Sequence, residues 1–315
     1  MVVTVTLNTS VDKAYILNQM ETGGVNRVKE TRNTAGGKGL NVARVARQLG
    51  TPVKAIGLVG GYSGEFILKK LREEEIDHNF LKVRGETRSC INVIEKERKR
   101  QTELLEPGPV VDAESLERFI DLYREEIKPA RVVCMSGSVP RGVPADIYKR
   151  LVEIAKIANK KVILDASGTL LEEGIKGAPS IVKPNQDEAE ALFDIKINSI
   201  SDARQAGERL LDMGVELGIV SLGKEGFVAV SPDFTYYVKP PEIEVVNTVG
   251  CGDSLVAGLA CGLDRGESLE DILRLGSAAS AANAMNMKTG YCHREDVNNI
   301  IDRVKVRDMS CNYSS

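Results

Sequence analysis

The segment NTVGCGDSLVAG, residues 247–258, places an aspartate directly after a turn rich in glycine. Gly250 and Gly252 flank Cys251, and Asp253 follows where an apolar helix is expected to begin. Glycines let an anion approach the backbone, and the free N–H groups and the dipole at a helix start attract it. A carboxylate beside such a site repels the anion unless it takes part in the chemistry. We therefore predict that Asp253 is a general base for a hydroxyl group while the neighbouring amides hold a phosphoryl group; the alternative is that it only stabilises the helix start.

A second glycine cluster, AGGKGLNVA at residues 35–43, also precedes a predicted helix. Lys38 and Asn41 are at positions i and i+3 and share one face of that helix. Together with Gly37 they suit the close approach of a hydroxylated or phosphorylated ligand, and a flexible loop with a surface lysine is the alternative. Asp12 follows the first predicted strand, at the edge where parallel sheets bind ligands, and it could accept hydrogen bonds from sugar hydroxyls.

These residues are distributed among strands and helices that alternate along the chain. Apolar runs predict strands at residues 2–7, 53–60, 131–137, 161–167, 180–185 and 217–223, and a hairpin at 227–230 and 235–240. Apolar residues at helical spacing predict helices at 39–50, 63–76, 144–158, 186–193, 201–213, 250–264, 268–285 and about 293–304. This alternation predicts an α/β fold with a mainly parallel sheet and helices on both faces.

Two segments, about 8–35 and 84–106, interrupt this alternation with short β-like runs and no helix. We interpret them as the strands of a small β-sheet lid over one edge of the main sheet; surface loops are the alternative. The charge run EKERKRQ, residues 95–101, is expected to be the solvated tip of a hairpin.

Composition excludes several classes of protein. The net charge of −3 over 315 residues gives no reason to expect nucleic acid or a membrane surface as a partner, and no apolar run is long enough to span a bilayer. The two histidines and the unpaired spacing of the cysteines make a zinc site improbable and predict reduced thiols in a cytoplasmic protein. These cysteines are Cys90, Cys134, Cys251, Cys261, Cys292 and Cys311. Neither a Walker A motif nor a GxGxxG fingerprint occurs, which argues against a nicotinamide-dependent oxidoreductase.

Five motifs in a fixed order carry a resemblance that covers essentially the whole chain. They are GGKGLNVA near the N-terminus, SGSVP at 136–140, KPNQDE at 183–188, SLGKEG at 221–226 and TVGCGDS near the C-terminus. In this order they resemble the ribokinase-like sugar kinases, in the phosphofructokinase-B branch. The resemblance implies a single ribokinase-like α/β domain over residues 1–315 and the use of ATP and Mg²⁺.

The resemblance also implies roles for individual residues. Asp253 matches the catalytic base of the family, and the amides of Gly250, Cys251 and Gly252 match its anion hole, although alanine is common where this chain has Cys251. Asn185 and Glu188 match an N-x-x-E motif that positions Mg²⁺ through water. The remaining implied contacts are nucleotide binding by Ser221, Gly223 and Asn283, and substrate binding by Gly37, Lys38, Asn41 and Ser138. For Asn283 an ordinary place in a helix is the alternative.

The substrate class is suggested by basic residues that match the phosphosugar members of the branch. Arg27, Lys38 and Arg88 are expected to hold a sugar phosphate, since guanidinium groups can bind phosphate through two hydrogen bonds. The branch includes 1-phosphofructokinases and tagatose-6-phosphate kinases, and we favour the first by a small margin. A homodimer through the lid is expected, because exposed sheet edges are usually covered. The alternative function is a sensor of the same fold that binds sugar phosphate and nucleotide without catalysis.

Overall fold

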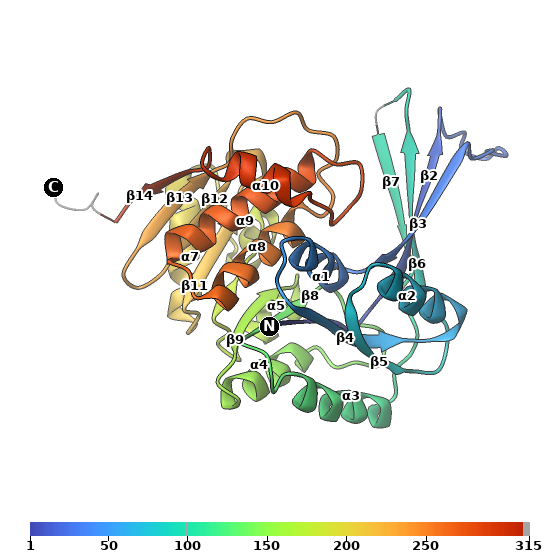
Figure 1. Ribbon diagram of the computed structural model, residues 1–315, viewed down its shortest axis with the longest axis horizontal. Helices are drawn as coiled ribbons and strands as arrows, with labels where there is room; N and C mark the ends of the chain where they lie inside the picture. Colours follow the sequence, from blue (N-terminus) through green and yellow to red (C-terminus); the bar gives the residue numbers. More distant parts are fainter. Residues whose placement is uncertain (99, 311–315) are drawn as a thin grey trace.

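The computed structural model describes residues 1–98 and 100–310, and its strands form two separate sheets (Figure 1). The larger sheet runs, from one edge to the other, through β14 (Lys305–Asp308), β13 (Thr235–Lys239), β12 (Phe227–Val230), β11 (Leu217–Ser221), β10 (Ile181–Val182), β9 (Lys161–Asp165), β8 (Val132–Ser136), β1 (Val2–Thr6), β4 (Val53–Val59) and β5 (Asp77–Lys82). Neighbours from β11 to β5 are parallel, and those from β11 to β14 are antiparallel. The predicted mainly parallel sheet is therefore confirmed.

Helices cover both faces of this sheet, as the sequence predicts. Successive residues of the central strands alternate between two hydrophobic cores, so that Val132 and Cys134 face one core while Val133 and Met135 face the other. The first core is completed by α1 (Lys38–Gln48), α2 (Gly61–Glu73), α8 (Cys251–Arg265), α9 (Leu269–Ala284) and α10 (Arg294–Ile301). The second is completed by α3 (Ala113–Glu126), α4 (Ile147–Ile157) and α5 (Thr169–Ile175). Beside β11 and β12 lie α6 (Gln186–Phe193) and α7 (Ile200–Asp212), which share a smaller core with these strands.

The smaller sheet projects from the α/β body (Figure 1). Its strands, in spatial order, are β3 (Glu30–Gly36), β2 (Ser10–Leu17), β6 (Arg88–Glu95) and β7 (Arg100–Leu105). The segments predicted at 8–35 and 84–106 thus form a sheet of their own, in which only the central pair β2–β6 is parallel. Within the described part of the charged run predicted at 95–101, Glu95 at the end of β6 pairs with Arg100 at the start of β7, and residue 99 lies outside the described residues.

Several elements were not predicted. No element was expected between residues 107 and 130, yet α3 lies there, with Asp112 accepting a hydrogen bond from the Ser115 N–H at 2.7 Å as its N-cap. The strands β5 and β14 and the short helix α5 were also missed. Asp12 lies within β2 of the smaller sheet, not in a loop after β1. Within the described residues, no helix is both long and apolar enough to cross a bilayer.

Candidate active site

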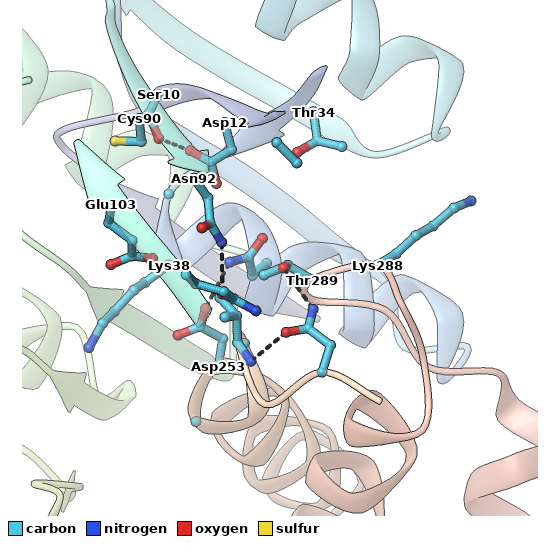
Figure 2. A pocket seen from close by; sticks show the side chains of 18 of the residues that line it. Ser10, Asp12, Thr34, Lys38, Cys90, Asn92, Glu103, Asp253, Lys288 and Thr289 are labelled. Atoms are coloured by element: carbon cyan, nitrogen blue, oxygen red, sulfur yellow. Dashed lines mark hydrogen bonds between the residues drawn. The ribbon is translucent and has the colours of Figure 1, made fainter. Parts of the chain in front are cut away.

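A cavity of about 780 Å³ lies between the smaller sheet and the carboxyl ends of the parallel strands (Figure 2). One side of it is formed by side chains of the smaller sheet, including Asp12, Cys90, Asn92 and Glu103. The opposite side is formed by the N-terminal ends of α1 and α8 and by residues at or just after the carboxyl ends of β9, β10 and β11. This volume is within the range typical of small-molecule sites, and the position matches the ligand-binding edge of open α/β sheets.

The turn before α8 requires glycine on two grounds. Gly250, the N-cap, has a φ of 82°, a conformation that side chains disfavour. A Cβ at this position would also lie 2.7 Å from the backbone nitrogen of Gly290. The Asn283 amide secures the same turn, donating to the Val249 carbonyl at 3.0 Å. The Cys251 N–H donates to the Thr248 carbonyl at 3.3 Å, and the turn presents the N–H groups of Gly252 and Asp253, which have no intrahelical acceptor, at the cavity.

Asp253, in the first turn of α8, lines the cavity although it is only 6% exposed. The Asn41 Nδ2 donates to its Oδ2 at 2.8 Å. Burial, reinforced by the negative charge of Asp165, raises the pKa of Asp253 to about 6, against the opposing effects of Lys38, Asn41 and Lys183. A carboxylate that gains and loses its proton close to neutral pH is suited to general base catalysis.

Two lysines share one carboxylate oxygen beside this turn. Lys38 Nζ lies 3.2 Å and Lys183 Nζ 3.3 Å from Oδ1 of Asp165, which ends β9. Lys183 is 4% exposed, and its ammonium would lie 3.6 Å from a Cβ at Gly252. Burial opposes ionisation of Asp165, but the charges of Lys183 and Lys38 lower its pKa overall. The α8 N-terminus therefore has two fixed cations next to it, as an anion site requires.

The smaller sheet contributes a carboxylate and a guanidinium. Asp12 accepts a hydrogen bond from Ser10 Oγ at 2.6 Å, and burial raises the pKa of Asp12. Its side chain fills the space over Gly36, where a Cβ would lie 2.1 Å away. Arg88 donates through Nη2 to the Asn8 carbonyl at 3.1 Å, while its buried Nε has no partner within the described residues. Its Nη1 also donates to the Glu106 carbonyl at 3.3 Å, so the guanidinium is held by two backbone carbonyls at the wall of the cavity.

The strand ends beyond Lys183 supply smaller polar groups. Asn185 caps α6, accepting from the Glu188 N–H at 2.8 Å, and the Glu188 carboxylate accepts from the Asn185 N–H at 2.9 Å through Oε2. Asn185 is also bridged to Ser221, so that these two residues and Gly223 line one end of the cavity. Gly223 has a φ of 58° and open space beyond its Cα.

These same residues limit how a metal could be held. Within the described residues no group of three or more His, Cys, Asp and Glu side chains could enclose a metal ion. The reciprocal bonds between Asn185 and Glu188 use only Oε2 of the Glu188 carboxylate, so Oε1 takes no part in capping α6. Such a set fits Mg²⁺ that keeps its waters and is bound mainly by phosphate oxygens, and it does not fit an all-protein metal cage.

Comparison with known proteins identifies the family. Residues 5–296 match the model of the pfkB family carbohydrate kinases. The chain belongs to this family. It is accordingly a phosphotransferase with an alcohol group as acceptor, which decides against the nicotinamide-dependent oxidoreductase.

Individual pfkB relatives match over nearly their full length. The chain is 40% identical over 312 residues to the tagatose-6-phosphate kinase of Staphylococcus epidermidis, covering 98% of this chain and 100% of that protein. The crystal structure of Escherichia coli phosphofructokinase-2 in complex with substrates and products has a TM-score of 0.90 at 30% identity, covering 96% of this chain and 98% of the other. A Thermotoga maritima structure described as a possible 1-phosphofructokinase has a TM-score of 0.88 at 27% identity, covering 98% and 99%.

Most of the residues predicted for a pfkB site line the cavity, and four do not. Arg27 is exposed in the connection between β2 and β3, and Ser138 is exposed after β8, where it accepts a hydrogen bond from Asn8 Nδ2 at 3.1 Å. Cys251 is half-buried, with its Sγ 3.4 Å from Asn283 Nδ2. Asn283 is fully buried in α9 and holds the turn before α8, and its place in an adenine pocket stays a prediction. The remaining predicted residues, which line the cavity, are Asp12, Gly37, Lys38, Asn41, Arg88, Asn185, Glu188, Ser221, Gly223, Gly250, Gly252 and Asp253.

Sequence reasoning missed two charged residues of this pfkB site, Asp165 and Lys183. Asp165 ends the short buried strand β9 and Lys183 directly follows β10, so the rule that selected Asp12 could have selected them as well. The cysteines within the described residues are free, in agreement with the expectation of reduced thiols, and Cys311 lies outside those residues.

Proposed function

We propose that this chain is an ATP-dependent kinase that phosphorylates a ketohexose phosphate to a bisphosphate, with tagatose 6-phosphate as its preferred acceptor. The observation that carries the proposal is the buried Asp253 at the N-terminus of α8, beside Lys38 and Lys183 in one cavity with Arg88. The relative at 40% identity supports tagatose 6-phosphate over fructose 1-phosphate, the acceptor that the sequence analysis favours by a small margin.

On the nucleotide side, the N–H groups of the Gly250–Gly252 turn and the two lysines would hold the migrating phosphoryl group. The two lysine side chains are held in place before reaction by their shared ion pair with Asp165. Preorganised charge of this kind is the main source of acceleration in phosphoryl transfer. Asn185, Ser221 and Gly223 would lie along the nucleotide. Mg²⁺, when bound, would neutralise phosphate charge, and Glu188 would contact it through water.

On the acceptor side, Arg88 would bind the phosphate of the sugar through its guanidinium, and Asp12 would accept hydrogen bonds from sugar hydroxyls. Asp253 would then remove the proton from the primary hydroxyl at the other end of the sugar as its oxygen attacks the γ-phosphorus. The smaller sheet would act as a lid over these groups, excluding water that would otherwise hydrolyse ATP.

The edge of the smaller sheet supports a homodimer. The edge strand β7 is exposed along its whole length, and Leu104 and Leu105 are 52% and 63% exposed. Apolar side chains on an open edge favour pairing with another strand, and we propose a second copy of this chain as the partner. Sedimentation at micromolar concentration should show a dimer that Leu105→Glu dissociates, and a monomeric wild-type chain would contradict the proposal.

The function is tested by incubating the protein with ATP, Mg²⁺ and each of tagatose 6-phosphate, fructose 1-phosphate and fructose 6-phosphate, and by measuring ADP. We expect ADP release with the highest kcat/KM for tagatose 6-phosphate. A higher kcat/KM for another phosphosugar would move the acceptor assignment to that sugar. Binding of these sugars without ADP above background would support the non-catalytic sensor and overturn the proposal.

A further inference from the structure

A chain of hydrogen bonds extends from Asp253 into the protein on the side away from the cavity. Asn41 donates through Nδ2 to Asp253 at 2.8 Å and accepts through Oδ1 from Arg44 Nη1 at 3.0 Å. Arg44 is one turn further along α1, is 7% exposed and does not line the cavity. The Asn41 amide therefore lies between a carboxylate and a guanidinium.

The chemistry of these two neighbours determines the orientation of the amide. A guanidinium has only donors and an ionised carboxylate only acceptors. With the amide turned over, its NH₂ would face Arg44 and its oxygen would face Asp253, so both hydrogen bonds would be replaced by repulsive contacts in a buried place. Breaking such bonds to charged groups without compensation is costly.

We propose that Arg44 is a positioning residue for the transfer reaction, which fixes the Asn41 amide so that it donates to Asp253. This inference rests on the proposed role of Asp253 as the base. Arg44 acts through Asn41 and needs no contact with either substrate.

Arg44 is itself held at two further points. Its Nη2 donates to the Ala35 carbonyl at 2.7 Å, and its Nε lies 2.9 Å from Oε2 of Glu74 at the end of α2. The guanidinium is planar and rigid, so three bonds in its plane leave it a single orientation. Ala35 belongs to β3, and Arg44 thereby links the smaller sheet to the residue that orients the base.

The other groups around Asp253 cannot replace this donor. Asp165, Lys38 and Lys183 act on Asp253 by their charge, and Lys38 and Lys183 are themselves bridged to Asp165. Without Arg44, the Asn41 amide is free to turn its oxygen toward the carboxylate. Asp253 then loses a donor to its charged form, so its pKa rises and less of the base is ionised at neutral pH.

The same helix offers a matched control. Arg47, three residues after Arg44, lies with its Nη2 2.7 Å from Oε2 of Glu75, the residue after Glu74. Its side chain is half exposed, and its guanidinium donates to both the carbonyl and the carboxylate of Glu75. Arg47→Met thus removes an arginine–glutamate pair between the same two segments and leaves the Asn41 amide untouched.

The experiment compares wild type, Arg44→Met and Arg47→Met by the pH dependence of kcat from pH 5 to 8. For Arg44→Met we expect the acidic limb to move up by about one pH unit, so that kcat falls roughly tenfold at pH 5 and about twofold at pH 7, with KM for ATP unchanged. Arg47→Met should keep the wild-type profile. Arg44→Lys retains the positive charge but not the planar guanidinium, and the acidic limb should move by an intermediate amount. An Arg44→Met profile with an unmoved acidic limb would overturn the proposal.

A second measurement does not depend on turnover. The pKa of Asp253 can be followed in the substrate-free protein by NMR of ¹³C-labelled aspartate, with the resonance assigned by its absence from Asp253→Asn. Arg44→Met should raise this pKa and Arg47→Met should not. If the wild type makes no ADP but this difference is found, the proposed function fails while the role of Arg44 in orienting Asn41 stands; equal pKa values in both variants would refute that role. Should Arg44→Met not fold, as judged by circular dichroism, Arg44→Lys serves in both measurements.

Discussion

Replacing Asp253 by asparagine should separate the chemistry of this carboxylate from its cost to the folded state. Asparagine has nearly the same shape and can still accept the hydrogen bond from Asn41, but it cannot take a proton from the acceptor hydroxyl. We expect kcat with the preferred sugar phosphate to fall by at least about two orders of magnitude, the scale of a lost general base. KM for ATP should stay close to that of the wild type.

The same substitution should stabilise the substrate-free protein at neutral and alkaline pH. Burial and the charge of Asp165 raise the pKa of Asp253 from 3.8 to about 6, so the folded protein favours the protonated form. The free energy of unfolding therefore falls as pH rises through this interval. A difference of about 2 pKa units corresponds to about 3 kcal/mol, fully present above about pH 7, about half as large near pH 5 and absent below about pH 4. Asparagine, which does not ionise, avoids this loss.

The assay is thermal unfolding of wild type and Asp253→Asn without ligands at pH 5, 6.5 and 8, together with steady-state kinetics. The stability advantage of the variant should grow with pH. Asp121→Asn provides the control, because it makes the same chemical change at an aspartate that is exposed on α3. A near-normal kcat would remove Asp253 from the mechanism, and a stability difference that stays constant or shrinks as pH rises would refute the argument from burial.

Further predictions concern the two ends of the cavity. Arg88→Ala should raise KM for the sugar phosphate far more than KM for ATP, because Arg88 lines the cavity from the smaller sheet, on the proposed acceptor side; equal effects in steady-state kinetics would show that the phosphate contact is misassigned. Lys183→Met should lower kcat by at least about tenfold, because it removes a buried cation beside the α8 N-terminus. A Lys183→Met variant with wild-type kinetics would exclude this lysine from phosphoryl transfer.

The strands of the main sheet could be predicted because each is marked by the residue types within a short segment of the sequence. The central strands are short runs of mostly buried residues, and β1, with five buried residues in VVTVT, is an example. The glycine turns at Gly37 and Gly250 were recognisable because glycine, a poor helix former, is favoured next to a helix start where the backbone is left-handed or closely approached. The helix α3 was missed although Leu116, Phe119, Ile120 and Tyr123 have helical spacing and are buried, so that signal was present in the sequence.

The contacts between the charged side chains of the site could not be predicted from local sequence patterns. A charged residue on an amphipathic helix is expected to face solvent, yet Arg44 is buried by partners on β3 and at the end of α2. The bridge of Lys38 and Lys183 to Asp165 joins three segments that are far apart in the sequence. Conversely, Arg27, Ser138 and Asn283 were selected by motif position alone, and motif position does not say which way a side chain points.

The passage from β3 to α1 has a mechanical consequence. Strand β3 ends at Gly36 and α1 begins at Lys38, so a single residue, Gly37, separates the sheet from the helix. The four strands of that sheet are joined by hydrogen bonds, so the sheet would tilt as one rigid body when a sugar binds in the cavity beneath it. Because the connection is only one residue long, a tilt of the sheet would directly displace the first turn of α1, which carries Lys38. Binding of the acceptor sugar would thus move Lys38, at the phosphate-binding end of the cavity, directly and without the movement of another segment.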